Sequence, residues 1–171
     1  FIHGTGMDHT VWTLPTRYFL RKDRTVISVD LPGHGRSKGP VLNSISEISY
    51  WLIDYLDSLD VNEFSIVGHS MGSLIALETS AIVPNRSLHL VMVGTAFPMN
   101  VSKTLLEAAK NNEQAAIDIL TYFGYSYSAR IGSNSNPGMW MTENTKRLLE
   151  KSHKDVIYND LKACSNYSDG L

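Results

Sequence analysis

The residues with the clearest chemical potential form one short run, Gly68-His69-Ser70-Met71-Gly72. The pattern G-x-S-x-G is short, but an apolar run ends just before it and a helical pattern begins just after it. A strand-turn-helix of this kind forces the serine to a positive φ, and glycines two positions to either side leave room for the crossing backbone. We therefore predict that Ser70 is a nucleophile, with Gly68, His69 and Gly72 supporting the turn. The alternative is an ordinary glycine-containing strand-helix turn.

Two backbone N–H groups are candidates for stabilising the oxyanion that forms when a serine attacks a carbonyl carbon. One belongs to Met71, at the expected start of a helix. The other belongs to Thr5, in a glycine-rich turn that follows an apolar segment, with Gly6 as the second choice. His3 and Gly4 are expected to support this turn. A plain strand-to-loop turn is the alternative interpretation.

A third glycine-rich turn follows another apolar run, Asp30-Leu31-Pro32-Gly33-His34-Gly35-Arg36-Ser37. Its glycines and proline indicate a tight loop, and Asp30 could accept hydrogen bonds from the loop backbone. The structural interpretation is favoured here, with His34 as a hydrogen-bonded loop histidine rather than a catalytic base.

The elements that must position these turns alternate between strand and helix patterns. Short apolar and β-branched runs predict strands at Thr25–Asp30, Phe64–Val67 and Leu88–Val93. Because these runs are apolar on both faces, they predict a parallel sheet covered by helices on both sides.

Two helices are predicted between and beside these strands. The first runs from about Ser44 to Leu59, because its apolar residues recur at helical spacing and Ser44 with Glu47 forms a capping box. The second runs from Met71 to Val83 and ends before Pro84.

The pattern changes after Pro98. Helix is predicted for Lys103–Phe123, with a break at Asn111-Asn112, and again for Thr142–Ala163. Between them, Ser126–Gly138 is rich in serine, asparagine and glycine and predicts a loop that ends in the Asn136-Pro137-Gly138 turn. We therefore predict two parts, residues 1–97 as an α/β core and residues 98–171 as a helical insertion that lies over it.

Composition excludes several classes of function. The 171 residues are 43% apolar and 19% charged with a net charge of −2, and no basic block suggests nucleic acid as a partner. No apolar run is long enough for a membrane span. Cys164 is the only cysteine, which excludes an internal disulfide. This fits a reducing, cytoplasmic location and equally a secreted protein without disulfides.

Taken in order, the three turns resemble those of the α/β-hydrolase fold family, in its serine esterase-like and lipase-like branch. The resemblance covers residues 1–97 closely and implies a mostly parallel sheet with a helical lid insertion after it. It also implies a triad in the chain order Ser, Asp or Glu, then His. Ser70 corresponds to the nucleophile, and the Thr5 and Met71 N–H groups correspond to the oxyanion hole. It implies a small-molecule, ester-like substrate and neither a metal nor an organic cofactor.

The sequence departs from the family in its acid and base. The family takes both from strands after the lid, whereas only His89 and His153 follow Ser70 here, one in a strand pattern and one in a helical pattern. Neither is favoured as the base. The first two strands of the family sheet are not evident either. We therefore expect a partial α/β-hydrolase, a fragment of a longer gene product that is nearly inactive by itself.

The predicted reaction is hydrolysis of a carboxylic ester or related acyl bond through an acyl-enzyme on Ser70. A C–C hydrolase, a cofactor-free peroxidase and a non-catalytic small-molecule-binding module with the same fold stay as alternatives. Aromatic and methionine residues of the lid could line an acyl pocket or form the lid's own core, namely Tyr122, Phe123, Tyr125, Tyr127, Met139, Trp140 and Met141.

Overall fold

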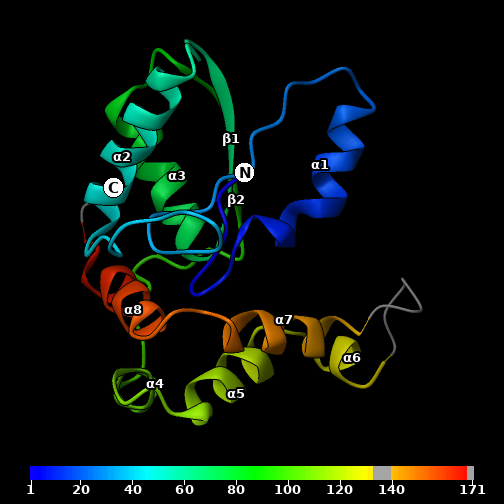
Figure 1. Cartoon of the computed structure of the whole chain (residues 1–171), viewed down its shortest axis with the longest axis vertical. Helices are drawn as coiled ribbons and strands as arrows, with labels where there is room; N and C mark the ends of the chain where they lie inside the picture. Colours follow the sequence, from blue (N-terminus) through cyan, green and yellow to red (C-terminus); the bar gives the residue numbers. More distant parts are fainter. Residues whose placement is uncertain (133–139, 169–171) are drawn as a thin grey trace.

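The computed structural model describes residues 1–132 and 140–168 (Figure 1). Two parallel strands, β1 (Phe64–His69) and β2 (Ser87–Val93), pair along their length. Helices α2 (Ile45–Ser58) and α3 (Met71–Ile82) lie on one side of these strands, and α1 (Thr13–Leu20) lies on the other (Figure 1). Both strands and both of the helices expected here are therefore confirmed.

Two short segments extend the sheet beyond β1. Ile2 makes parallel bridges to Gly68 on one side and to Val29 on the other, which gives the order Val29, Ile2, β1, β2. The Ile2 N–H donates to the Val67 carbonyl at 2.8 Å. The predicted strand at Thr25–Asp30 is wrong as a continuous strand. Within the described part of the chain, Val29 is the one residue of this segment that forms a bridge, and its partner is Ile2 in the short segment before Gly4.

Helix α2 begins where the capping box predicts. The Ser44 hydroxyl accepts a hydrogen bond from the Glu47 N–H at 3.1 Å, and the Glu47 carboxylate accepts one from the Asn43 N–H. Its apolar stripe enters the core, with Ile45 and Ile48 almost completely buried. Leu59, which was expected on this stripe, is exposed because it caps the C-terminal end of the helix.

Helix α3 is the most deeply buried element. It packs against β1, β2 and α2, and Met71, Leu74, Ile75 and Ala76 have no solvent exposure. It ends at Ile82, just before Pro84, as expected. This burial fixes the N-terminal end of α3, the end that follows Ser70.

The helical segment that precedes α2 was not predicted from the sequence. A 3₁₀ turn η1 (His9–Trp12) leads into α1. The Asp8 carboxylate caps this turn by accepting from the Thr10 N–H at 2.8 Å. Helix α1 carries Pro15 in its first turn, where proline is tolerated, and buries none of its residues. It therefore has little of the apolar periodicity by which a helix is recognised.

The second part of the chain is helical, with α4 (Lys103–Lys110), α5 (Gln114–Phe123), α6 (Tyr127–Arg130), α7 (Met141–Glu150) and α8 (Val156–Asn166). The break at Asn111-Asn112 is confirmed, and Asn112 has a φ of 54°. The single helix predicted at Thr142–Ala163 is wrong, because Asp155 adopts a left-handed φ of 68° and divides it into α7 and α8. The loop predicted for Ser126–Gly138 is wrong over Tyr127–Arg130, which form α6 because the Ser126 hydroxyl caps the helix by accepting from the Ala129 N–H. The predicted Asn136-Pro137-Gly138 turn lies outside the described residues.

Helix α8 lies between α3 and the layer of α4, α5 and α7 (Figure 1). Its Ala163 and Cys164 belong to the core formed by the sheet and α3, whereas its Leu161 packs with Ala108 and Ala116 of α4 and α5. The division at residue 97 stays a prediction, and α8 is the element that joins the two parts.

The expectation that helices cover both faces of every strand is wrong for β2. Leu88, Val91 and Val93 are each more than 40% exposed, since α2 and α3 cover only the opposite face. Among the residues that the structure describes, no helix is both long and apolar enough to cross a bilayer.

Candidate active site at the turn between β1 and α3

Ser70 occupies the corner between β1 and α3. Its backbone has φ 53° and ψ −119°, a conformation that residues other than glycine rarely adopt. The corner is held on both sides, because the Ser70 N–H donates to the Val93 carbonyl at 2.9 Å and the Ser70 carbonyl accepts from the Ser73 N–H at 2.8 Å. The predicted positive φ is confirmed, and the strain is maintained by β2 and by the first turn of α3.

The two glycines that flank this corner are required by space. A Cβ on Gly68 would lie 1.9 Å from the Gly72 carbonyl oxygen, and a Cβ on Gly72 would lie 2.5 Å from the carbonyl oxygens of Ile2 and His3. All of these are backbone atoms, which cannot rotate away. The predicted steric reason for the G-x-S-x-G spacing is therefore confirmed.

The loop after Ile2 lies directly beside Ser70. A Cβ on Gly4 would be 3.3 Å from the Ser70 Cβ and 3.0 Å from the His69 Nδ1. Thr5, the next residue, is buried. Within residues 1–132 and 140–168, the N–H groups of Thr5 and Met71 donate no hydrogen bond. The N–H groups of Thr5 and Met71 are thus two unused donors, one on each of the two backbone segments that meet at Ser70.

His3 fixes the start of this loop, as expected for a supporting residue. Its buried ring accepts a hydrogen bond from the Leu31 N–H at Nε2, 3.1 Å away, and its Nδ1 lies 2.9 Å from the Gly4 carbonyl. A ring that accepts at Nε2 and donates at Nδ1 is neutral. Burial, followed by the nearby His34, lowers the pKa of His3 to about 4.

This lowered pKa predicts acid sensitivity. Below pH 6.5 the unfolded chain protonates His3, whereas the folded chain does so only near pH 4, so the free energy of unfolding falls as pH decreases through this window. The loss expected from this one group is on the order of 3 kcal/mol. Urea denaturation between pH 7 and pH 4 measures it. His3→Gln keeps an acceptor without this titration and should show a shallower decrease, whereas equal decreases would contradict the assignment.

Sequence analysis missed one residue that is central to this loop, Asp160 of α8. Its side chain is fully buried, and its Oδ2 accepts hydrogen bonds from the Gly6 N–H at 2.8 Å and from the His34 Nε2 at 2.9 Å. The signal was present in the sequence, because Asp160 falls on the apolar stripe of α8 that Ile157, Leu161 and Cys164 form at helical spacing.

Each of the six histidines has a described position. His9 binds Asp30, His34 binds Asp160, and His89 lies 3.0 Å from the Ser65 hydroxyl on β1. The His69 ring lies between Gly4 and Gly94, and His153 lies in the connection between α7 and α8 rather than inside a helix as predicted. In the part of the chain that the structure describes, no histidine or carboxylate forms a hydrogen bond with the Ser70 hydroxyl.

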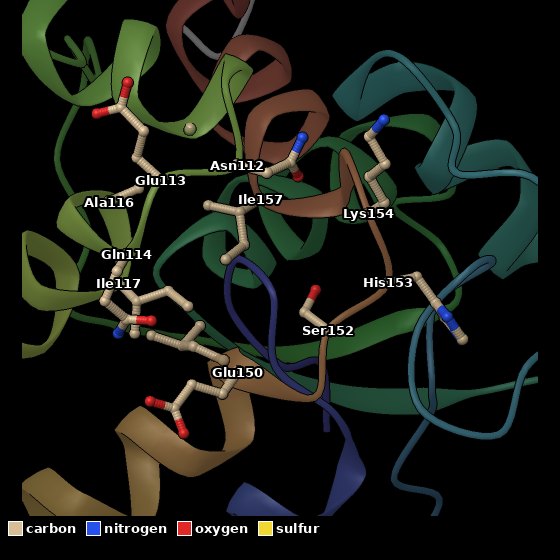
Figure 2. A pocket seen from close by; sticks show the side chains of 12 residues that line it. Asn112, Glu113, Gln114, Ala116, Ile117, Glu150, Ser152, His153, Lys154 and Ile157 are labelled. Atoms are coloured by element: carbon tan, nitrogen blue, oxygen red, sulfur yellow. The ribbon is translucent and has the colours of Figure 1, made fainter.

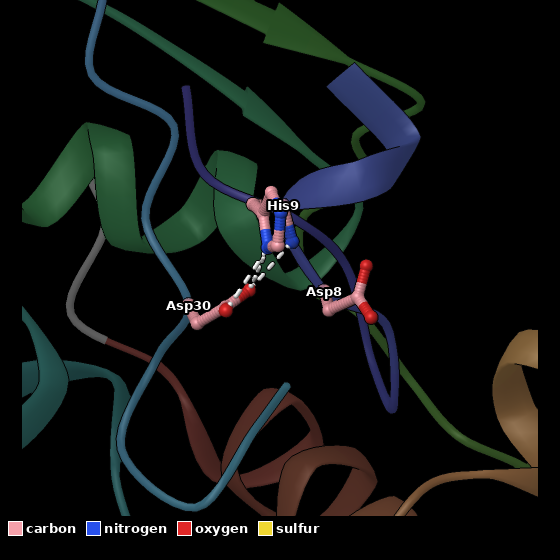
Figure 3. A group of neighbouring side chains, drawn as sticks. All are labelled: Asp8, His9 and Asp30. Atoms are coloured by element: carbon pink, nitrogen blue, oxygen red, sulfur yellow. Dashed lines mark hydrogen bonds and ion pairs between the residues drawn. The ribbon is translucent and has the colours of Figure 1, made fainter. Parts of the chain in front are cut away.

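A second cluster, Asp8, His9 and Asp30, could offer three metal ligands within 4.8 Å of one another (Figure 3). Its carboxylates already accept hydrogen bonds from the loops. Asp30 accepts from the N–H groups of His9, at 2.7 Å, and Arg36, at 3.0 Å, while Asp8 caps η1. These bonds overcome the effect of burial and hold the pKa of Asp30 below its usual value. The cluster therefore stabilises the surrounding loops, which is the structural role predicted for Asp30.

A cavity of about 520 Å³ lies among α5, α7 and α8 (Figure 2). Glu113, Glu150 and Lys154 stand on its rim, and its lining includes Leu149 and Ile157. Ser70, Thr5 and Met71 do not line it.

Four of the lid aromatic residues, Tyr122, Phe123, Tyr127 and Trp140, are each more than 55% exposed. The interpretation that they form the lid's own core is therefore wrong, whereas an acyl pocket lined by them stays a prediction. Met139 lies outside the described residues.

Comparisons with known proteins agree with this arrangement. A model of the Alpha/beta hydrolase family matches residues 1–157. The (E)-2-((N-methylformamido)methylene)succinate hydrolase of Acinetobacter baylyi is 26% identical over 98% of this chain and 66% of its own length. The 2-hydroxymuconate semialdehyde hydrolase of a Pseudomonas strain is 33% identical over 56% of this chain and 35% of its own length.

Among solved structures, a thermophilic esterase superposes with a TM-score of 0.75 at 26% identity. The match covers 98% of this chain and 60% of the esterase. The chain thus spans less than two thirds of the length of the Acinetobacter hydrolase and of the thermophilic esterase.

Proposed function

Because this chain belongs to the alpha/beta hydrolase family, we propose that the whole protein is a serine hydrolase in which Ser70 attacks the carbonyl carbon of an ester or related acyl bond. The observation that carries the proposal is the strained backbone of Ser70, held at φ 53° on the corner between β1 and α3. Strain of this kind persists only where the surrounding structure enforces it, and it is concentrated at functional sites.

The first half of the reaction forms an acyl-enzyme. A general base takes the Ser70 proton, the hydroxyl oxygen adds to the carbonyl, and the leaving alcohol departs with that proton. The six histidines of the chain are placed elsewhere, so we propose that the base is a histidine of the whole protein outside these residues. Water then attacks the acyl group by the same route, which releases the carboxylic acid and restores the serine.

The N–H groups of Thr5 and Met71 support the second part of the proposal, an oxyanion hole. Neither is used by another acceptor in the described structure, and their segments approach Ser70 from two sides. Donors that are already in place when charge develops on the carbonyl oxygen lower the barrier by about 3 kcal/mol each. This mechanism needs no metal or organic cofactor. We also propose that residues 98–171 form a lid that covers the site.

The substrate that we propose is a small molecule with an ester-like acyl bond, by analogy with the esterase that superposes on the chain. A second candidate is C–C bond hydrolysis. It is favoured by the relation to 2-hydroxymuconate semialdehyde hydrolase, and it would use the same serine and the same donors.

A fluorophosphonate probe tests the proposal. Wild-type whole protein is expected to be labelled stoichiometrically, whereas Ser70→Ala is expected to give no labelling. A panel of p-nitrophenyl esters, lactones and ring-cleavage products then separates ester from C–C hydrolysis. A folded wild-type protein that the probe does not label would leave only the non-catalytic binding module.

A further inference from the structure

We propose that Asp160 is a positioning residue, whose carboxylate holds the loop of residues 3–6 so that the Thr5 N–H faces the oxyanion formed on Ser70. This inference rests on the proposed function and adds to it a group from α8, in the second part of the chain.

The Asp160 carboxylate contacts the loop of residues 3–6 directly. Asp160 binds the N–H of Gly6 at 2.8 Å, and this N–H belongs to the peptide group that joins Thr5 to Gly6. Fixing that peptide plane limits rotation of the Thr5 backbone on its C-terminal side, while His3 and the bridge at Ile2 hold the loop from the other side. The orientation of Thr5 is therefore set between β1 and α8.

Gly6 is packed closely against side chains of α7 and α8. A Cβ at this position would lie 2.9 Å from the Ile157 Cγ1 and 3.0 Å from the Leu149 Cδ2, and Gly6 has a φ of +64°. Side chains of α7 and α8 thus lie directly against the loop. Gly6 has little space in which to move away from the carboxylate.

The Asp160 carboxylate also contacts the ring of His34. The His34 Nδ1 lies 3.0 Å from the Pro32 carbonyl oxygen and its Nε2 lies 2.9 Å from Asp160. Both ring nitrogens face oxygen atoms, an arrangement that favours the doubly protonated imidazolium form of His34 beside the Asp160 carboxylate. Burial lowers the pKa of His34, but the hydrogen bond and charge of Asp160 outweigh that effect, so the pKa lies above its usual value.

Stability alone does not account for this arrangement. A buried ion pair contributes little compared with well-packed apolar side chains. In addition, the other oxygen, Oδ1, is buried without a hydrogen-bond partner among the described residues, which is unfavourable. What the pair does provide is a fixed position for one backbone N–H next to the donor that faces the serine.

The test measures catalysis per active site rather than total activity. Whole-protein Asp160→Ala and Asp160→Asn are titrated with a fluorophosphonate, and kcat, KM and melting temperature are then measured with an ester that the wild type hydrolyses. Asp118→Asn is the matched control, because Asp118 is an exposed aspartate of α5 that pairs with Lys146 at 3.1 Å.

Loss of the positioning contact should lower kcat per titrated site about 10- to 100-fold in Asp160→Ala, with KM changed less than about threefold. Asp160→Asn keeps an oxygen that can accept from Gly6, so its loss should be smaller, about 3- to 10-fold. Affinity for a trifluoromethyl ketone, which places an oxyanion in the hole, should fall in parallel with kcat, and the control should match the wild type.

A lower melting temperature with wild-type kcat per titrated site would overturn the inference and leave Asp160 as a structural contact only. Should Asp160→Ala fail to fold, Asp160→Asn decides the question, and an unchanged kcat per site would overturn the inference. A folded wild type that is not labelled would overturn the proposed function and this inference together. Labelled wild type with unaffected Asp160 variants would overturn the inference alone.

Discussion

Replacing Ser70 with alanine in the whole protein is expected to lower kcat/KM for its best ester substrate at least about a thousandfold. The change removes the attacking oxygen and leaves the backbone corner intact, because alanine tolerates φ 53° no worse than serine. Substrate binding should therefore be retained. Steady-state kinetics and equilibrium binding of a non-hydrolysable substrate analogue measure the two effects separately.

Ser80→Ala is the matched control for this variant. Ser80 lies on the same helix, α3, but its hydroxyl binds the Ser87 hydroxyl at 2.8 Å, at the start of β2. Its loss should change kcat/KM less than about twofold, since surface and peripheral substitutions change stability by only about 0.5 kcal/mol. A Ser70→Ala protein that keeps a tenth or more of wild-type kcat/KM would contradict the assignment of Ser70 as the nucleophile.

Gly68→Ala is expected to have the second largest effect, on both folding and activity. Its Cβ would lie 1.9 Å from the Gly72 carbonyl oxygen and 2.6 Å from the Ser73 N, so the first turn of α3 must move away from β1. We expect the free energy of unfolding to fall by about 4 kcal/mol or more, which is at the upper end for single substitutions. Any protein that still folds should lose most of its fluorophosphonate labelling, because Ser70 moves with the corner.

Gly39→Ala is the control that separates the steric clash at Gly68 from the cost of replacing any glycine whose backbone has a positive φ. Gly39 has a φ of +104°, and a Cβ there would meet no atom within 4 Å. Only the backbone strain remains, so the expected loss is about 1 to 2 kcal/mol and labelling should be unchanged. Urea denaturation of the three proteins provides the comparison. Equal losses for Gly68→Ala and Gly39→Ala would show that the crowded corner is not what constrains the glycine.

Much of the site's framework could be predicted from local sequence. Continuous apolar runs indicate strand β1 and helix α3. Gly68 and Gly72 indicate the corner between them, because a Cβ on Gly68 would clash with the Gly72 carbonyl four residues later. Helix α2 is marked by its Ser44 cap. These are short-range signals, and the structure agrees with them.

The features that sequence analysis missed depend on distant contacts. Asp160 reaches Gly6 across 154 residues and His34 across 126, so no local pattern reveals the partners. A continuous strand at Thr25–Asp30 would need a neighbouring segment of similar length to pair with. The strand propensity of these residues carries no information about that neighbour. The division between α7 and α8 occurs at Asp155, a residue whose left-handed backbone is fixed by hydrogen bonds to Asn112.

In the proposed mechanism, Ser70 becomes covalently acylated during turnover. The most direct measurement is rapid acid quenching of the whole protein with p-nitrophenyl acetate, followed by proteolysis and mass spectrometry of the peptide that contains Ser70. We expect that peptide to gain the mass of one acetyl group, at the Ser70 hydroxyl, within the pre-steady-state burst. An unmodified Ser70 in a protein that is turning over the ester, or an acetyl group on a different residue, would contradict the account.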